Sequence, residues 1–540
     1  MRDKSTARDI PNQRVNHDLK KRPESLKSRT GTGSAVCRHE IHANGLWLAE
    51  THKKCSGIPV QSNIRVRMSK PTLKQTNDGD GMEIYTKLLS WAADQSIDLN
   101  GLSPQRIPGR GIGIVATRQL KKDEILLKIP TTALRTLDTV SKPLTRSLPL
   151  ENLSVQGILA VDLALTVSPP EKHGPWNAVM PTRKEVWSGL PITWDSALHD
   201  FLPRPARDLL SKQQSKFERD WEVVLSTQAS RPDLFSPELS RDDYLYAWLL
   251  VNTRSFYYDI STKTGTKLQK KRRKTLSRDD KMVLMPVADL FNHSDSGCGV
   301  GFDDSGFTVT ADRAYEEGEE VYVCYGRHSN DFLLVEYGFV PRPRVAGRTG
   351  NAWDEVKIDD AILGELSVKR NSKRRRALLE ERGYLGNYIL DATTGEACYR
   401  TQVALRAMNP RFSETKWTEF VDNGVDEGDE TQREEVQKDA DRLLARILRR
   451  YLRNVNKSVS DVEETKDVGE QGQRDLLCLR WRQIRDVITT SIDSLSIQDD
   501  TEPDKEMAGG AYDVPKFISG YTQQQEQRKV KKEEEKKPKR

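Results

Sequence analysis

Two short stretches of the chain carry residue types that can do chemistry. The first, residues 284–294, is an apolar run that ends in Asn292, His293 and a serine. The second, residues 320–330, alternates apolar and polar side chains as a strand does and delivers Tyr325 into a turn. Read alone, the asparagine–histidine pair suggests a metal ligand or a catalytic histidine, and the tyrosine offers a hydroxyl that can orient a reacting group. The rest of the chain must supply the elements that hold these stretches together.

A glycine-rich loop lies well upstream of these stretches. Gly109, Gly111 and Gly113 stand at alternate positions, which permits a tight loop whose backbone can approach a ligand closely. A dinucleotide-binding loop would read Gly-x-Gly-x-x-Gly and open a helix, whereas the apolar residues at 114–117 and 124–130 indicate strands. The sequence therefore predicts that the loop enters a β-hairpin, and it argues against a Rossmann nucleotide site.

The order of the remaining elements predicts an α+β fold. Residues 131 to about 255 have helical apolar spacing, and a basic, polar loop covers about 260–281. Two short strands around an Asp-Asp-Ser-Gly turn are expected within residues 301–311, and a short capped helix is expected over 331–337. From 355 to 490 the apolar residues recur at helical spacing, which predicts an all-α second domain.

Length and composition indicate folded domains with polar ends. The chain has 540 residues, more than one compact core usually holds, and 31% of the residues are charged. Residues 1–80 and 495–540 are polar and aperiodic, so we expect a disordered N-terminal arm and a disordered Lys-rich tail. No apolar run in the sequence approaches the roughly 20 residues that span a bilayer, and the first residues form no apolar leader segment. We therefore expect no membrane association and no secretion.

The cysteines indicate an intracellular protein without a bound metal. The six cysteines lie far apart and form no disulfide-like framework, which fits a reducing compartment. The residues Cys37, His39, His42, His52 and Cys55 are zinc-ligand types. Their spacing matches no standard zinc finger and the surrounding sequence is polar and irregular, so we expect no metal site.

Positive charge is clustered although the net charge is only +6. Residues 270–274, residues 373–376 and the Lys-rich end form three basic blocks, each of which has the composition of a nuclear-import or nucleic-acid patch. Each block is explained more simply as a solvated loop or tail. Nucleic acid is therefore not an expected partner.

Three blocks of the chain together resemble a known family. The glycine loop, the segment Ala288–Ser294 and the strand Tyr322–Gly326 match the order and separation of the sequence blocks of SET-domain methyltransferases. With the helical insertion and the Tyr-Gly-Phe ending at Phe339, the resemblance is to the subfamily of the plant Rubisco large-subunit methyltransferase, over roughly residues 82–490. Many histone-directed SET enzymes carry a zinc-binding cysteine cluster just after the catalytic tyrosine. No such cluster follows Tyr325 in this sequence.

The resemblance implies a fold and a reaction. It implies a SET domain over residues 82–345, with small β-sheets and a knot-like threading of its C-terminal part, and a helical substrate-binding-like domain over 355–490. It also implies methyl transfer from S-adenosyl-L-methionine to a protein lysine. The implied partner is a protein substrate, for which ribosomal proteins and translation factors are candidates by analogy. We expect the chain to act as a monomer in the cytoplasm or the nucleus.

The resemblance also implies roles for individual residues. Tyr325 is the expected catalytic residue, whose hydroxyl orients the amine. The expected cofactor-binding residues are Arg110, Gly111, Ile112, Arg254, Asn292, His293 and Phe339. The expected substrate-binding residues are Phe256, Asp289, Tyr325 and Tyr337. For Phe256 and Phe339, ordinary packing in the core is the alternative.

Two alternative functions keep the same fold. A protein-histidine methyltransferase would use the site on a different acceptor. A non-catalytic interaction module would keep the fold without the reaction, and the intact Asn292, His293 and Tyr325 argue against it.

Overall fold

The computed structural model describes most of the chain between residues 79 and 495. The described segments are 79–149, 152–166, 174–258, 281–342, 350–409, 411–424 and 428–495. Nearly all of the expected N-terminal arm, the zinc-type residues from Cys37 to Cys55, most of the basic loop and the Lys-rich tail lie outside these segments. Within them, no helix is both long enough and apolar enough to cross a membrane.

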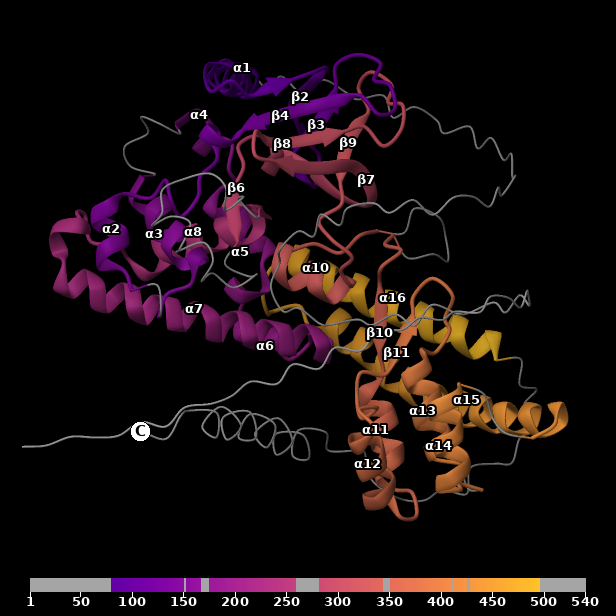
Figure 1. Ribbon diagram of the computed structural model, residues 1–540. Helices are drawn as coiled ribbons and strands as arrows, with labels where there is room; N and C mark the ends of the chain where they lie inside the picture. Colours follow the sequence, from indigo (N-terminus) through magenta and orange to yellow (C-terminus); the bar gives the residue numbers. More distant parts are fainter. Residues whose placement is uncertain are drawn as a thin grey trace, which may run out of the picture. The chain divides into compact units, whose positions relative to one another are not determined.

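A seven-stranded mixed sheet lies at the centre of the first part of the fold. Its strands follow the order β1-β4-β8-β7-β9-β3-β2, which interleaves strands from the two ends of this region (Figure 1). Their bounds are Asp98–Leu99 (β1), Leu102–Ile107 (β2), Gly111–Ala116 (β3), Ile125–Pro130 (β4), Asn292–Asp303 (β7), Gly306–Thr310 (β8) and Glu320–Val323 (β9). The helix α1, Gly79–Asp94, precedes the sheet and buries Leu88 and Ala92.

The predicted β-hairpin after the glycine loop was wrong. The strand β3 pairs antiparallel with β2 and β9, whereas β4 pairs with β8 and β1. The segment between β3 and β4 is instead held by a bridge between Leu120 and Tyr315, and both of these side chains are buried. Both strands are strongly apolar, so burial against distant strands decides their pairing, which local spacing does not reveal. The predicted strands around the Asp-Asp-Ser-Gly turn are confirmed as the pair β7–β8.

The region between the two groups of strands is helical, as the apolar spacing predicted. Its helices are Lys142–Ser147 (α2), Val155–Thr166 (α3), Gly174–Asn177 (α4), Arg183–Gly189 (α5), Ser196–His199 (α6), Arg204–Ser230 (α7) and Arg241–Arg254 (α8). The last of these leads into β5, Ser255–Tyr257, which pairs antiparallel with β6, Met282–Leu284. The 3-10 turn Ala288–Leu290 then connects β6 to β7.

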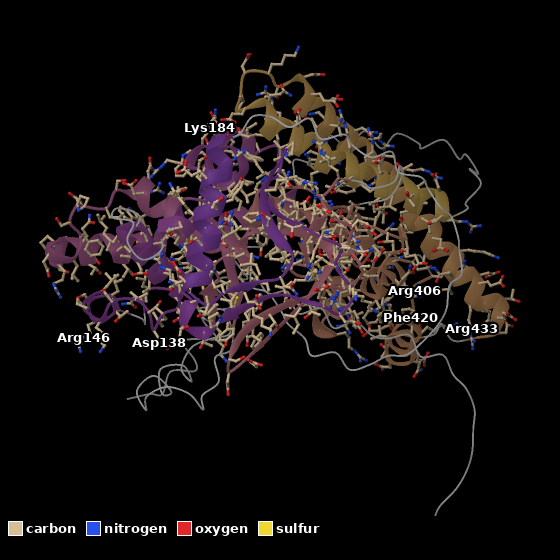
Figure 2. The ribbon with its side chains drawn as sticks, turned by 90° about the horizontal axis from the view of Figure 1, so that it is seen from above. Asp138, Arg146, Lys184, Arg406, Phe420 and Arg433 are labelled. Carbon is tan, nitrogen blue, oxygen red and sulfur yellow. The ribbon has the colours of Figure 1, made fainter. Side chains whose placement is uncertain are left out.

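The C-terminal part is mainly helical but carries one small sheet that an all-α domain would lack. Its strands, Glu355–Lys357 (β10) and Ile389–Asp391 (β11), pair antiparallel. Its helices are Asp359–Ser367 (α11), Ser372–Glu381 (α12), Tyr399–Ala407 (α13), Glu414–Asn423 (α14), Glu430–Glu464 (α15) and Gln471–Ser494 (α16). The guanidinium of Arg406 on α13 lies 4.1 Å from the centre of the Phe420 ring on α14. Figure 2 labels both residues.

Two hydrophobic cores organise the described segments of the chain, and the second joins both parts. The first core lies around the sheet and the helices α3 and α8. The second core gathers α11 to α16, but it also contains Leu334 and Val335 of the helix α10, Asn330–Tyr337, and Leu198 and Leu202 from the helical insertion. The C-terminal helices therefore cover apolar surface that belongs to the preceding region.

The basic block at 373–376 lies on the helix α12 and is not a solvated loop. Arg375 is 8% exposed and donates hydrogen bonds to the carbonyls of Ala407 and Asn409. Arg374 pairs with Glu414. Arg375 therefore serves packing within the C-terminal part, while Lys373 and Arg374 stay exposed on the helix surface.

Candidate active site

The parallel pairing of β7 and β9 brings the two chemical stretches together. Asn292 lies opposite Tyr322, and His293 lies opposite Val323. The register shifts between His293 and Cys298, which both lie opposite Val323, so residues 294–297 bulge out before β7 continues beside β8. The polar end of the first stretch therefore lies beside the strand that delivers Tyr325.

Tyr325 is fixed at both ends by the first stretch. Its backbone N–H donates to His293 Nδ1 at 3.0 Å, and its hydroxyl donates to the Phe291 carbonyl at 2.7 Å. Burial raises the pKa of Tyr325 above its ordinary value, and the nearby Arg254 opposes that effect only in part. The hydroxyl therefore stays neutral at physiological pH, which suits a group that orients a reactant more than one that removes a proton.

Four rings form an aromatic cluster around this tyrosine, namely those of His293, Tyr325, Tyr337 and Phe339. The Tyr325 ring lies 5.1 Å from His293, 5.0 Å from Tyr337 and 6.5 Å from Phe339. Phe339 also lies 5.9 Å from His293. The hydroxyl of Tyr337 is buried without a hydrogen-bond partner in the described structure. Such a cluster offers ring faces to a cationic or methylated amine.

The helix α10 and its C-terminal glycine place two of these rings. Ser329 caps the helix by accepting from the N–H of Phe332, as the sequence predicted. Gly338 ends it in the left-handed conformation, with φ +78°, and the N–H of Phe339 reaches back to Leu333. A Cβ at Gly338 would lie only 2.8 Å from the Gly189 carbonyl oxygen. Only glycine therefore fits at the turn between the two aromatic residues.

A second network joins the glycine loop to Asn292 through Glu320, a residue that the sequence reading missed. Asn292 donates to one oxygen of Glu320 at 2.8 Å, and Arg110 and the Tyr322 hydroxyl contact the other oxygen at 2.8 and 2.7 Å. Arg110 also donates to the Tyr322 hydroxyl at 2.7 Å. A Cβ at Gly113 would lie 2.8 Å from both Asn292 and Glu320. The strand alternation held a signal, because Glu320 and Tyr322 are two residues apart and share a face.

The glycine loop presents its backbone on an open side. Gly109 and Gly111 have φ of +74° and +75°, and a Cβ at either position would meet no atom within 4 Å. Ile112 follows as a half-buried residue of β3, paired with Arg106. The space beside Gly109 and Gly111 is the kind that lets a ligand approach main-chain groups closely.

Arg254 and Asp289, which were predicted to bind the cofactor and the substrate respectively, form an ion pair with each other. The guanidinium of Arg254 donates to the Asp289 carbonyl at 2.6 Å and lies 3.2 Å from its carboxylate. The indole N–H of Trp176 lies 3.1 and 3.2 Å from the two carboxylate oxygens. Burial raises the pKa of Asp289, and Arg254 opposes that shift. One nitrogen of the group predicted to receive the cofactor carboxylate thus contacts Asp289, while its Nε is buried without a hydrogen-bond partner in the described structure.

Phe256 lies in the core. It belongs to β5, is 4% exposed, and packs edge-on against Phe307 at 5.4 Å. This arrangement matches the ordinary packing role that the sequence left open.

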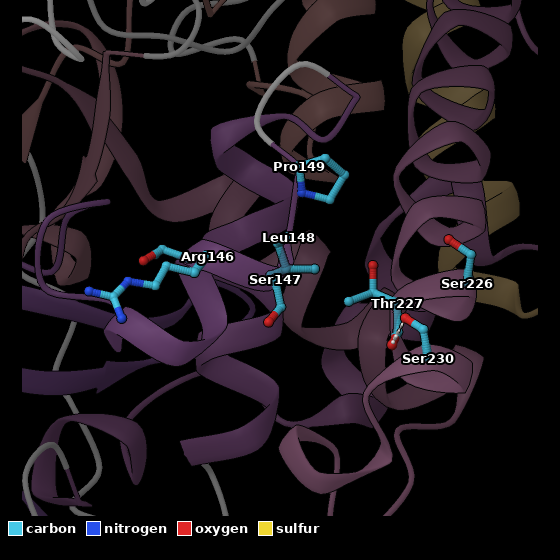
Figure 3. Close-up of a pocket in the computed structure, with 8 residues that line it drawn as sticks. Arg146, Ser147, Leu148, Pro149, Ser226, Thr227 and Ser230 are labelled. Carbon is cyan, nitrogen blue, oxygen red and sulfur yellow. Dashed lines mark hydrogen bonds between the residues drawn. The ribbon is translucent and has the colours of Figure 1, made fainter.

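A separate hollow lies in the helical insertion (Figure 3). It has a volume of about 450 Å³ and lies between α2 and α7. Its lining is rich in hydroxyl groups and includes Arg146, Ser147, Ser226, Thr227 and Ser230. No predicted site residue lines it. Among the described residues, no group of three or more His, Cys, Asp or Glu side chains is placed to hold a metal ion.

Comparison with known proteins agrees with this geometry. The SET domain model matches residues 111–326, a span that runs from the glycine loop to the turn after Tyr325. This part of the chain is therefore a SET domain, as the three sequence blocks predicted, and the α+β fold class is confirmed.

The relatives by sequence are named as SET proteins and methyltransferases. SET domain-containing protein 4 of Mus musculus is 24% identical over 316 residues, which cover 56% of this chain and 68% of that protein. Ribosomal lysine N-methyltransferase set11 of Schizosaccharomyces pombe is 24% identical over 303 residues, with the same two coverages. Actin-histidine N-methyltransferase of Danio rerio is 24% identical over 365 residues, which cover 63% of this chain and 56% of that protein.

A solved structure shares the fold over most of the chain. Rubisco LSMT bound to sinefungin and monomethyllysine aligns with a TM-score of 0.50 and 12% identity, covering 76% of this chain and 91% of that one. The SET fold that the resemblance implied is thus confirmed, whereas the substrate-binding-like role of the C-terminal part stays a prediction.

Proposed function

We propose that this chain is an S-adenosyl-L-methionine-dependent protein N-methyltransferase that modifies a lysine of a non-histone protein. The observation that carries the proposal is the placement of Tyr325. Its neutral hydroxyl is held by the Phe291 carbonyl within the aromatic cluster, and the open glycine loop is linked to the adjoining Asn292 through Glu320.

The cofactor would supply a methyl group on a positively charged sulfur, and the residues present fit such a group. The open space beside Gly109 and Gly111 leaves room for a ligand against the loop backbone. Asn292, held by Glu320, and His293, next to the Phe339 ring, line the adjoining edge of β7. We propose Arg110, Gly111, Ile112, Asn292, His293 and Phe339 as the cofactor side. Arg254, which is engaged by Asp289, would act there by holding the 3-10 turn before β7.

The acceptor side must present a neutral amine in line with the methyl group. A free lysine has a pKa of about 10.4, so an apolar, ring-lined site has to disfavour the ammonium form. We propose that Tyr325 orients the amine and that Tyr337 walls the channel. We place Asp289, which accepts from Trp176 and Arg254, on the same acceptor side. Alignment of the reacting atoms can contribute about 7 kcal/mol or more to lowering a barrier, which makes ring placement the main task of the protein here.

The choice of lysine rests on the names of relatives as well as on the site. Ribosomal lysine N-methyltransferases of two yeasts support a lysine and a ribosomal protein, while the actin-histidine enzymes support the alternative acceptor. By the same analogy we propose action in the cytoplasm or the nucleus.

One experiment separates these functions. The full chain is incubated with radiolabelled S-adenosyl-L-methionine and a cell lysate, and labelled peptides are mapped by mass spectrometry. Methyl-lysine is the expected product, and methyl-histidine would instead support the alternative. If no label is transferred and calorimetry finds no binding of sinefungin, the chain is a non-catalytic module and the proposal fails.

A further inference from the structure

A fully buried arginine of the last described helix, α16, binds two buried aspartates. Arg480 is 0% exposed and grips Asp331 in a fork, with Nε–Oδ1 and Nη2–Oδ2 distances of 2.8 and 2.9 Å. Its remaining nitrogen, Nη1, donates to Asp354 Oδ2 at 2.8 Å. Both aspartates are also buried. Bidentate geometry of this kind fixes direction as well as distance.

The partners of Arg480 lie at the start of the helix that carries the aromatic cluster. Asp331 is the second residue of α10, which begins shortly after Tyr325 and ends at Tyr337. Asp354 reinforces the same point, because its other oxygen accepts the N–H of Asn330 at 2.8 Å. Arg480 therefore holds the N-terminus of α10 through two separate carboxylates.

A second residue of α16 holds both ends of the same segment. Gln483 accepts from the Asn330 side chain at 2.9 Å and donates to the Pro341 carbonyl at 2.7 Å. Asn351 completes the contact by donating to the His328 carbonyl at 2.8 Å and to Asn330 at 2.9 Å. The stretch from Asn330 to Pro341 is thus held at its beginning and its end by α16, and Asn351 adds a contact to the preceding His328.

The turn that contains Asp354 also contacts β7, the strand whose His293 accepts from the backbone of Tyr325. The indole N–H of Trp353 donates to the Asp295 carbonyl at 3.1 Å, and the N–H of Ala352 donates to the Asp295 carboxylate at 3.1 Å. Asp295 belongs to β7, the strand that holds Tyr325. A continuous set of contacts therefore runs from α16 to α10, which ends at Tyr337, and to β7, which carries His293.

Stability alone does not explain a buried ion cluster. Removing charged groups from water is costly, and apolar packing of similar volume often gives equal or greater stability. What the charges add is a single allowed arrangement of the elements that carry them. Tyr325 is anchored by Phe291 and by His293 of β7. The described contacts that fix the start of α10 come from α16 and the turn beside it, whereas Glu336 near the end of the helix accepts from Asn252 and Gln213.

We propose that Arg480 is a positioning residue, through which α16 sets the placement of α10 and so the 5.0 Å spacing between the rings of Tyr337 and Tyr325. The C-terminal helices would then take part in catalysis by shaping the acceptor channel. The activity readout of this inference rests on the proposed methyltransferase function, whereas its structural readout does not.

The test replaces the whole ion cluster with groups that pack. The variant Arg480→Met/Asp331→Leu/Asp354→Asn removes the charges together, so no buried carboxylate is left unpaired. We expect it to fold, with kcat lowered by about tenfold or more, because small misplacements near a reacting centre are costly. The affinity for sinefungin is expected to fall less than kcat, because Phe339 is the one proposed cofactor residue that follows α10, while the others lie in the glycine loop and on β3 and β7. The single variant Arg480→Lys, which keeps a positive charge beside both aspartates, should have a kcat between those of the cluster variant and the wild type.

The matched control is Arg375→Met. Arg375 is also buried in the C-terminal part, but it donates to the carbonyls of Ala407 and Asn409 and does not contact α10 in the described structure. Its loss should lower the melting temperature and leave kcat per folded molecule unchanged. A cluster variant with wild-type kcat, or an equal loss of kcat in Arg375→Met, would overturn the positioning role.

Hydrogen exchange separates this inference from the proposed function. Amides of residues 328–341 should exchange faster in the cluster variant than in the wild type, and Arg375→Met should leave them unchanged. Unchanged exchange in the cluster variant would overturn the inference. If the wild type transfers no methyl group at all, the proposed function fails, and the exchange result still decides whether α16 holds α10.

Discussion

At the scale of single residues, the site depends on hydroxyl and carboxylate groups whose partners are backbone atoms and one another. Tyr325 is held between His293 and the Phe291 carbonyl, so its ring and hydroxyl have little freedom. Glu320 receives Asn292, Arg110 and Tyr322 on one carboxylate. The two groups have different proposed roles. Tyr325 belongs to the aromatic cluster on the acceptor side, whereas Glu320 links residues of the cofactor side.

Glu320→Gln should weaken cofactor binding more than it slows the chemistry. The amide keeps the volume but loses the ion pair with Arg110 and turns one acceptor oxygen into a donor. We expect the affinity for sinefungin to fall by about tenfold, equivalent to about 1.4 kcal/mol, with a smaller effect on kcat. Isothermal titration calorimetry measures the change. Glu319→Gln is the matched control, because the Glu319 carboxylate is next to Glu320 in sequence but pairs with Arg313, outside the network. Equal affinities for wild type and Glu320→Gln would contradict this role.

His328 should make the fold sensitive to acid. Its ring stacks on Phe332 at 4.1 Å, and burial lowers the pKa of His328 from 6.5 to about 4. Because the folded pKa lies below the unfolded one, the neutral ring contributes stability above about pH 6.5 that is lost as the pH falls toward about 4. We expect His328→Phe, which keeps the stacking, to lose less free energy of unfolding over that interval than the wild type. Urea denaturation at both ends of the interval checks this, and parallel losses would count against it.

Some of these contacts were predictable from the sequence and others were not. The residue types and order of Asn292, His293 and Tyr325 predicted that they meet, and the pairing of β7 with β9 brings them together. The contact of Arg254 with Asp289 was not predicted, because a free arginine and a paired one look alike in sequence. Phe256 illustrates the same limit, since an aromatic residue beside a site and one in the core share a composition signal.

At the scale of elements, the position of α10 decides where two of the cluster rings lie. The serine cap and the following glycine are local signals, so the extent of this helix could be predicted. The pairing of β3 and β4 could not, because their partners are β9 and β8, which come from far along the chain. Non-local pairing is set by which apolar faces find each other in the folded core, and local alternation carries no information about it.

Gly338→Ala should destabilise the protein by more than an ordinary glycine replacement. Gly338 combines φ +78° with a Cβ site 2.8 Å from the Gly189 carbonyl oxygen. Gly383 has a similar φ of +75° but no atom within 4 Å of its Cβ site, so Gly383→Ala reports the backbone cost alone. We expect a loss of about 1 kcal/mol for Gly383→Ala and about 2–3 kcal/mol for Gly338→Ala. Chemical denaturation gives both values, and equal losses would show that the contact with Gly189 does not matter.

At the scale of the whole molecule, the SET region and the C-terminal helices share the second core. Leu334 and Val335 on α10 pack with side chains from α11 to α16, and Leu198 and Leu202 join them from the insertion. The change of sequence character near residue 355 suggested the start of a second domain. It marks a change of secondary structure, but burial continues across it.

A fragment that ends before this boundary should therefore fold poorly. We compare residues 79–342 with residues 79–495. The shorter fragment uncovers the apolar side chains of α10 and leaves Asp331 without Arg480, so we expect low solubility and no cooperative thermal transition by circular dichroism. A soluble short fragment with a sharp transition would show that the second core is not needed by the SET region.

The most direct measurement of the central claim compares Tyr325→Phe with Tyr246→Phe in methyl transfer from labelled S-adenosyl-L-methionine to the mapped protein substrate. Each change removes a tyrosine hydroxyl that donates to a backbone carbonyl, at 2.7 Å for Tyr325 and 2.6 Å for Tyr246. We expect kcat to fall by about 100-fold in Tyr325→Phe, with its melting temperature close to that of Tyr246→Phe, which should keep wild-type kcat. Transfer by Tyr325→Phe at the rate of Tyr246→Phe would contradict the account.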